Sequence, residues 1–196
     1  MPLVYKKTSK DTIMKYQKEY NNKEIVGILK IEGADINTLL VQTDNNSYYL
    51  NHLVNKKPNK TGSVFVDYRT NIDGAKQVNI YGHSSGGYDL PFDRLKKYLD
   101  KDFYEQNKIV TIDTIYDSYR YEIFSVKVTS DEEHLKVEYN DKESFAKHLD
   151  KLKNNSLYET GVEVTTEDDI LVLQTCITNN PKGSLLIINL RKVGEV

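Results

Sequence analysis

The sequence predicts a mainly β fold, built as a barrel or a sandwich with a few helices at its periphery. Short apolar segments separated by polar turn residues recur from Ile25 to His83, and they resume at Ile109. Between them, only Leu90–Tyr104 and Glu143–Lys153 place apolar residues at the three- and four-residue spacing of a helix. Many short strands with few helices indicate a barrel or sandwich rather than alternating strand–helix units.

The length and composition of the chain fit one soluble domain. Its 196 residues suffice for a full-sized core, and we expect residues 1–22 to form an N-terminal helical extension before a single domain at 23–196. Charged residues make up 29% of the chain and the net charge is −2, so no nucleic-acid or membrane-binding surface is predicted. No apolar run approaches the roughly 18 residues of a membrane span.

The first half of the chain contains one expected helix and a series of expected strands. Ile13, Tyr16 and Tyr20 recur at helical spacing, which predicts a short helix over Thr12–Tyr20. Strands are predicted where β-branched and aromatic residues stand between turn residues. These strands are Ile25–Ile31, Thr38–Gln42, Tyr48–Leu50, Ser63–Tyr68 and Gln77–His83.

The second half adds the two amphipathic helices and the remaining strands. Strands are expected at Ile109–Ile112, Tyr119–Thr129, Asp169–Cys176 and Leu185–Leu190. The last two are separated by an Asn-, Pro- and Gly-containing turn, so they are expected to form a hairpin with Cys176 at its mouth.

Cys176 is the only cysteine, which excludes an intramolecular disulfide and a cysteine-rich metal site. A free cysteine is most often a small buried hydrophobe, and this interpretation stays open on the strand alone. A strand end would also suit a nucleophile, because the sheet holds the backbone rigid. Reactivity then needs a neighbour that favours the thiolate, most often histidine.

Four histidines are available as partners of Cys176. His134 lies in a run of acidic residues and is expected to be solvated. His148 is expected at the boundary of a helix stripe, and the position of His52 is uninformative. His83 ends an apolar strand before the Ser- and Gly-rich loop at 84–87, just as Cys176 ends its own strand before a loop. His83 is therefore the preferred partner, provided that the two strand ends meet in space.

Several motifs, in order along the chain, resemble those of a sortase and most of all class B. Segments 26–31, 46–50 and 62–69 resemble successive early-strand motifs of that class. Tyr81-Gly82-His83 resembles its histidine motif, and Leu173-Gln174-Thr175-Cys176 resembles its Leu-x-Thr-Cys motif. The helix expected at Glu143–Lys153 fits the long class B connection before the cysteine strand.

The resemblance implies an eight-stranded β-barrel and a cell-wall transpeptidase, with Cys176 as nucleophile and His83 as its proton partner. Such an enzyme cleaves the C-terminal sorting signal of a secreted protein and joins the new carboxyl end to a peptidoglycan amine. It acts outside the membrane of a Gram-positive cell, so an N-terminal membrane anchor is expected upstream of Met1. Gln174, Thr175 and Ser184 are expected to contact substrate, with the loop at 84–87 near the rim of the groove.

The sequence departs from the family pattern at several positions. The family has an Arg on the strand after the cysteine, and the matching position here is Ser184. Lys182 could bring a charge nearby, whereas Arg191 is seven residues further along and roughly 23 Å away in an extended strand. Gln174 stands where many members have Ser, and Ser84 where class B members usually have Asn. Three interpretations stay open: another residue supplies the charge, backbone N–H groups and Ser184 suffice at a lower rate, or the chain is a weakened or altered sortase.

Two alternatives to a transpeptidase follow from these departures. One is a weakened sortase-like module that holds a peptide without turning it over, and the other is a cysteine hydrolase. No cofactor is predicted. The single cysteine and scattered histidines do not have zinc-ligand spacing, and no dense acidic loop calls for calcium.

Overall fold

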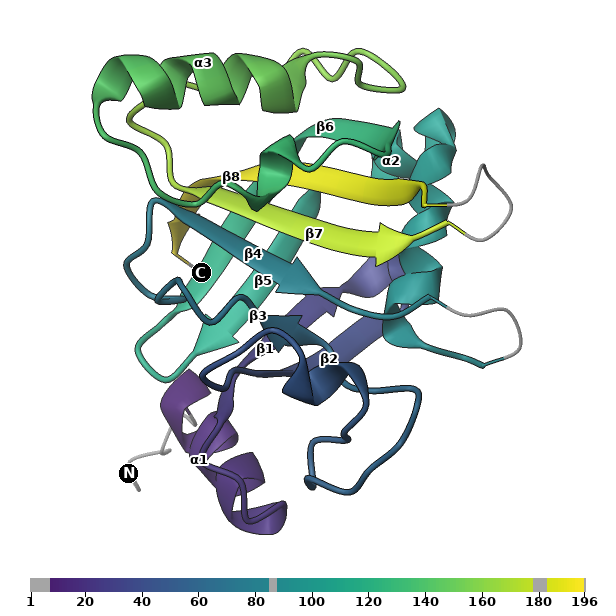
Figure 1. Cartoon of the computed structure of the whole chain (residues 1–196), viewed down its shortest axis with the longest axis vertical. Helices are drawn as coiled ribbons and strands as arrows, with labels where there is room; N and C mark the ends of the chain where they lie inside the picture. The colour runs from purple at the N-terminus through teal and green to yellow at the C-terminus, as the bar shows by residue number, and fades with distance from the viewer. Residues whose placement is uncertain (1–7, 85–87, 178–182, 196) are drawn as a thin grey trace, which may run out of the picture.

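The computed structural model describes residues 8–84, 88–177 and 183–195, and it contains a closed β-barrel (Figure 1). The strand order around the barrel is β1-β2-β3-β4-β7-β8-β6-β5. This closed, eight-stranded architecture confirms the expected fold class and settles the choice between barrel and sandwich. The strands are β1 Ile25–Ile31, β2 Ile36–Val41, β3 Phe65–Val66, β4 Gln77–Tyr81, β5 Ile109–Thr114, β6 Ser118–Thr129, β7 Ile170–Cys176 and β8 Leu185–Glu195.

The pairing of β4 with β7 joins two parts of the chain that are far apart in sequence. The two strands are parallel, with Gln77 opposite Ile170 and Tyr81 opposite Gln174. β2 and β3 are also parallel, whereas the other neighbouring strands are antiparallel. β7 and β8 form the expected hairpin, with Cys176 opposite Leu185. Because β4 and β7 point the same way, their carboxyl ends lie side by side (Figure 1).

β7 is apolar on both faces because it lies between two hydrophobic layers. Alternate residues of a strand face opposite sides of the sheet. Leu171 and Leu173 belong to the cluster that fills the barrel, and Ile170 and Val172 pack in a second cluster with Phe145 of helix α3. By the same alternation, Gln174 and Cys176 continue the outer face. The strand therefore turns its final polar and reactive side chains away from the barrel interior.

The helices cover the outside and the ends of the barrel. α3 lies across the outer face near β6 and β8, and α1 lies at the opposite end of the molecule (Figure 1). α1 begins with a capping box between Thr8 and Asp11, and α3 begins with one at Asp141 and Ser144. The helical elements are α1 Ser9–Glu19, α2 Lys101–Gln106, α3 Lys142–Lys153, and the 3₁₀ helices η1 Glu32–Ala34, η2 Tyr48–Leu50, η3 Pro91–Leu99 and η4 Glu133–Leu135.

Two predicted elements differ from the structure in type or in continuity. Tyr48–Leu50 is the helix η2 rather than a strand, because the side-chain oxygen of Asn45 accepts hydrogen bonds from the N–H groups of Ser47 and Tyr48 and closes a turn. The single helix expected at Leu90–Tyr104 is divided into η3 and α2. Asp100 between them has an extended backbone, and its carboxylate caps α2 by accepting from the N–H of Asp102.

The strand predicted at Ser63–Tyr68 is reduced to Phe65–Val66. Asp67 ends it, because its carboxylate accepts a hydrogen bond from the N–H of Arg69 and turns the chain. The division at residue 22 between an extension and the main domain stays a prediction. In the described ranges, no helix has the length and apolar character needed to cross a membrane.

Candidate active site

His83 and Cys176 follow the carboxyl ends of the two parallel strands. Cys176 is the last residue of β7 and is exposed, while His83 lies two residues beyond β4 and is half-buried. Two hydrogen bonds continue the strand pairing up to these residues. The N–H of Gly82 donates to the carbonyl of Gln174 at 3.2 Å, and the hydroxyl of Thr175 donates to the carbonyl of Gly82 at 2.8 Å. The residues immediately before the histidine and the cysteine are therefore bonded to each other.

The imidazole of His83 is oriented by a backbone carbonyl. Its Nε2 lies 2.6 Å from the carbonyl oxygen of Leu50, the last residue of η2. A carbonyl can only accept a hydrogen bond, so Nε2 carries the hydrogen and Nδ1 is the nitrogen that can take up a proton. This carbonyl would also stabilise the imidazolium, because the donor becomes charged when Nδ1 is protonated.

Gly82 permits the close packing that fixes the end of β4. A Cβ at this position would lie 2.6 Å from ring atoms of Phe92, a fully buried residue of η3. Glycine is the residue that allows the backbone to approach a ring this closely. The backbone leading into His83 is therefore held between Phe92 on one side and β7 on the other.

Thr175 and Ser184 occupy different positions relative to Cys176. The Thr175 side chain is 2% exposed, with its hydroxyl bonded to Gly82, so it braces the two strands. Any contact of Thr175 with substrate would come from its backbone, and its predicted role in binding stays a prediction. Ser184 is half-buried just before β8, and its carbonyl accepts from the N–H of Ile177 at 3.0 Å. Ser184 is thus beside the nucleophile strand, as expected from the hairpin.

Arg191 and Lys182 are the cations nearest in sequence to position 184, where the resemblance leads one to expect an Arg. Arg191 lies opposite Ile170, at the start of β7, and its guanidinium pairs with Glu122 at 2.9 Å. It is therefore at the other end of the strand from Cys176, as its sequence separation predicts. Lys182 lies outside the described residues, as do residues 85–87 of the loop expected at the groove rim. Ser84 of that loop is buried and donates to a carboxylate oxygen of Asp93 at 2.8 Å.

A cavity of about 240 Å³ lies beside His83. Its walls are mainly apolar and come from β2, the segment at 53–64 and the start of η3. The aliphatic residues of the lining are Leu39, Leu53, Val54, Val64, Leu90 and Pro91. A mainly apolar recess next to the imidazole of His83 has the character of a binding site for an apolar group.

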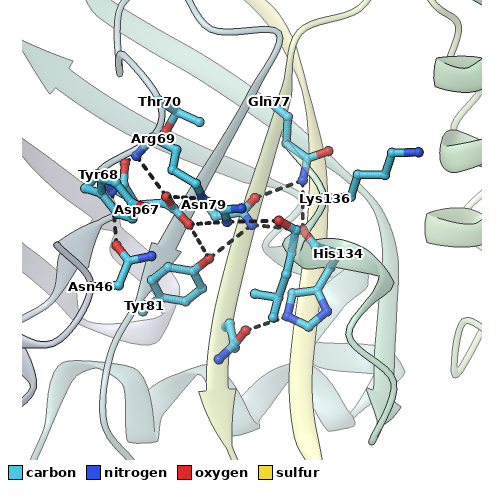
Figure 2. A network of polar contacts seen from close by, with 12 residues as sticks. Asn46, Asp67, Tyr68, Arg69, Thr70, Gln77, Asn79, Tyr81, His134 and Lys136 are labelled. Atoms are coloured by element: carbon cyan, nitrogen blue, oxygen red, sulfur yellow. Dashed lines mark hydrogen bonds and ion pairs between the residues drawn. The ribbon is translucent and has the colours of Figure 1, made fainter. Parts of the chain in front are cut away.

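His134 and His148 differ from their sequence predictions. His134 was expected in solvent and His148 at a boundary, but they are 2% and 1% exposed. His134 is buried because two amide side chains of β4 bind its backbone. Gln77 and Asn79 donate to the carbonyl of His134 at 2.9 and 2.8 Å (Figure 2). The local charge pattern of the sequence does not reveal these contacts. These bonds hold η4 against the sheet, and the ring of His134 reaches Gln174 on β7, with 2.5 Å between Nε2 and Oε1.

The buried state of His134 predicts a pH-dependent stability. Burial lowers the pKa of His134 from its ordinary value of 6.5. The hydrogen bond to Gln174 and the charges of Asp131 and Glu132 oppose this effect, and Lys127 adds to it. The unfolded chain therefore takes up this proton at a higher pH than the folded chain. The free energy of unfolding should be at its full value above pH 6.5 and fall as the pH decreases toward the lowered pKa.

Urea unfolding of wild type and His134→Phe at several pH values between about 7 and 5 measures this effect. The free energy of unfolding of the variant should decrease less as the pH is lowered. The decrease that remains is due to His148, whose pKa burial also lowers. Burial raises the pKa of Asp73 toward this pH range, but Asp73 is present in both proteins, so its contribution cancels in the comparison. Burial alone would raise the pKa of Asp67, but hydrogen bonds from Arg69 and Tyr81 lower it below 3.8, outside this window. Equal slopes for the two proteins would contradict the prediction.

Among the described residues, no group of three or more His, Cys, Asp or Glu side chains is placed to hold a metal ion. The chemistry available at the site is instead that of a thiol, an imidazole and nearby backbone groups. A cysteine and a histidine at the ends of adjacent strands, next to an apolar recess, are the arrangement expected of an enzyme with a cysteine nucleophile.

Comparison with known proteins identifies the family. The sortase domain model matches residues 29–189. Sortase B of Staphylococcus aureus (strain NCTC 8325 / PS 47) is 33% identical over 177 residues, which are 89% of this chain and 72% of that protein. Sortase B of Listeria monocytogenes serovar 1/2a (strain ATCC BAA-679 / EGD-e) is 35% identical over 170 residues, which are 85% of this chain and 69% of that protein.

A solved structure agrees with these relatives. The Staphylococcus aureus sortase B–substrate complex superimposes with a TM-score of 0.85 at 27% identity, covering 95% of this chain and 87% of that one. The chain therefore belongs to the sortase family, and its similarity is to class B. It is a cysteine transpeptidase, which confirms the resemblance found in the sequence motifs and does not favour the alternatives of an inactive module or a hydrolase. Sortases are cell-surface enzymes of Gram-positive bacteria.

Proposed function

We propose that this sortase cleaves the C-terminal sorting signal of secreted proteins through a thioester on Cys176 and transfers the acyl group to a peptidoglycan amine. The observation that carries the proposal is the parallel pairing of β4 with β7, which brings the residues preceding His83 and Cys176 into direct hydrogen bonding. A peptide substrate is supported by the similarity to sortase B of Staphylococcus aureus, whose structure was solved with a substrate.

In the first half-reaction, Nδ1 of His83 takes the proton of the Cys176 thiol. The thiolate attacks the scissile carbonyl carbon, and the C–N bond breaks as the imidazolium returns the proton to the leaving amine. The Leu50 carbonyl, bound to Nε2–H, stabilises the positive ring during this exchange. The acyl group is left on sulfur as a thioester.

In the second half-reaction, the acceptor amine attacks the thioester carbonyl and gives a proton to His83. The C–S bond breaks, Cys176 regains a proton, and a new amide is formed. Transfer prevails over hydrolysis only when the amine is positioned better than water. The cavity beside His83 and the residues Gln174, Thr175 and Ser184 are assigned to substrate binding in this scheme.

The expected location follows from the same scheme. Sorting signals and peptidoglycan amines are met together outside the membrane, so the enzyme is assigned to the outer face of a Gram-positive cell membrane. An N-terminal anchor would hold it there. Fractionation of cells that express the complete gene, with detection of the enzyme in the membrane fraction, tests this assignment.

Intact mass spectrometry tests the proposed reaction. The wild-type protein, mixed with a set of sorting-motif peptides, should gain the mass of the N-terminal peptide fragment, and Cys176→Ala should gain nothing. Addition of a short glycine peptide as amine should remove the adduct and yield a joined product. Release of free acid at the same rate with and without the amine would instead identify a hydrolase, and absence of any wild-type adduct would refute the proposed chemistry.

A further inference from the structure

Gln174 lies two residues before Cys176, and its side chain is held by a residue from a distant segment. The strand alternation places both side chains on the outer face of β7. The carbonyl oxygen of the Gln174 amide accepts a hydrogen bond from Nε2 of His134 in η4. The amino end of the same amide has no partner among the described residues, and Gln174 is half-buried.

Several hydrogen bonds hold η4 in place, so the contact from His134 can determine how the Gln174 amide is oriented. The carbonyl of His134 accepts hydrogen bonds from both Gln77 and Asn79 (Figure 2). The next carbonyl, that of Leu135, accepts from the guanidinium of Arg69 at 2.9 Å. Arg69 is itself paired with the fully buried carboxylate of Asp67, with two nitrogen–oxygen distances of 2.9 and 2.7 Å. The η4 backbone is thus attached to β4 and to the turn after β3 by charged and amide groups.

We propose that His134 is a positioning residue that orients the Gln174 amide, so that its N–H groups bind a carbonyl oxygen of the acyl-donor peptide beside the scissile bond. The inference rests on the proposed function. An amide can present either its oxygen or its nitrogen to a ligand, and a neutral ring that donates from Nε2 selects the nitrogen. A fixed donor two residues from the nucleophile favours substrates with a hydrogen-bond acceptor at the facing position.

The chain offers a matched control in His148. It is as deeply buried as His134 and belongs to the same polar cluster, where its Nε2 lies 2.8 Å from Oε1 of Gln77. Its other ring nitrogen faces Glu133, at 3.3 Å. No hydrogen bond connects His148 to β7 in the described part of the chain. Replacing it perturbs the cluster to a similar degree without removing the bond to Gln174.

The experiment is a double-mutant cycle on the rate of acylation by a sorting-motif peptide. Gln174→Ala and His134→Phe should each lower kcat/KM for acylation about three- to tenfold, the effect expected for one hydrogen bond. The double variant should be no slower than Gln174→Ala alone. Once the Gln174 amide is absent, removing the His134 ring that orients it has no further effect on acylation. His134→Gln, which retains an N–H donor, should recover part of the loss.

Two further measurements separate positioning from general damage. The pH dependence of Cys176 alkylation should be the same in His134→Phe and wild type, and His148→Phe should leave kcat/KM unchanged even where it lowers the melting temperature. Multiplicative losses in the double variant, or equal losses in His134→Phe and His148→Phe, would overturn the inference while acylation itself stands. A wild-type protein that forms no acyl-enzyme would overturn the proposed function and the inference with it.

Discussion

Replacement of His83 by alanine is expected to lower the rate of acyl-enzyme formation by about a hundredfold to ten-thousandfold, the range typical of a lost general acid–base. The imidazole is bonded through Nε2 to the Leu50 carbonyl, which leaves Nδ1 as the nitrogen that can exchange protons with the thiol and the leaving amine. Without it, the thiol has to ionise unaided and the amine has to leave without a proton.

Single-turnover acylation followed by mass spectrometry measures this loss. His52→Ala is the matched control, because His52 lies two residues after Leu50, the partner of His83, and stacks on Tyr48 with 4.0 Å between ring centroids. The control should retain nearly the full rate. If His83→Ala kept more than about a tenth of the wild-type rate, another group would have to be the proton partner of Cys176.

Introduction of arginine at Ser184 is expected to raise the acylation rate by about tenfold to a hundredfold. The sortase family has an Arg at the matching position, and loss of one oxyanion donor typically costs about a hundred- to a thousandfold. Ser184 is in the right place to receive it. Its carbonyl is bonded to the N–H of Ile177, directly after Cys176, and the next residue pairs with the cysteine itself.

Ser184→Lys and Ser184→Gln serve as controls for this gain. Lysine brings the charge without the planar pair of donors, and glutamine brings a donor without charge, so both should give smaller increases than arginine. Thermal unfolding of each variant shows whether the substitution disturbs the hairpin. A rate that stays the same or falls in a folded Ser184→Arg protein would mean that other groups already stabilise the oxyanion.

The sequence predicted the barrel strands well, because their apolar and β-branched runs stand between clear turn residues. It also placed Cys176 at the mouth of the β7–β8 hairpin correctly. The error at Tyr48–Leu50 arose because aromatic residues favour strands, whereas the Asn45 side chain bonds to the backbone and closes a turn. That error concealed a part of the site, since the Leu50 carbonyl is the partner of His83.

The burial of His134 could not be predicted from the sequence around it. The acidic residues beside His134 suggest that it is exposed to solvent. The amides of Gln77 and Asn79 that hold its backbone come from β4, more than 50 positions earlier in the chain. A buried polar network depends on which side chains the tertiary fold brings together, and short-range periodicity carries no information about that. The same limit applied to His83 and Cys176, whose strand ends could be compared in sequence but not joined.

The hydrogen bond between Thr175 and Gly82 spans 93 positions of the chain and lies next to both reactive residues. Its partners meet only after β7 has been added beside β4, a late and slow kind of event in folding because a long loop must close first. Until then the two proposed catalytic residues, His83 and Cys176, are not held at adjacent strand ends. We therefore expect that the incompletely folded chain does not form an acyl-enzyme, and that acylation begins only once β7 has paired with β4.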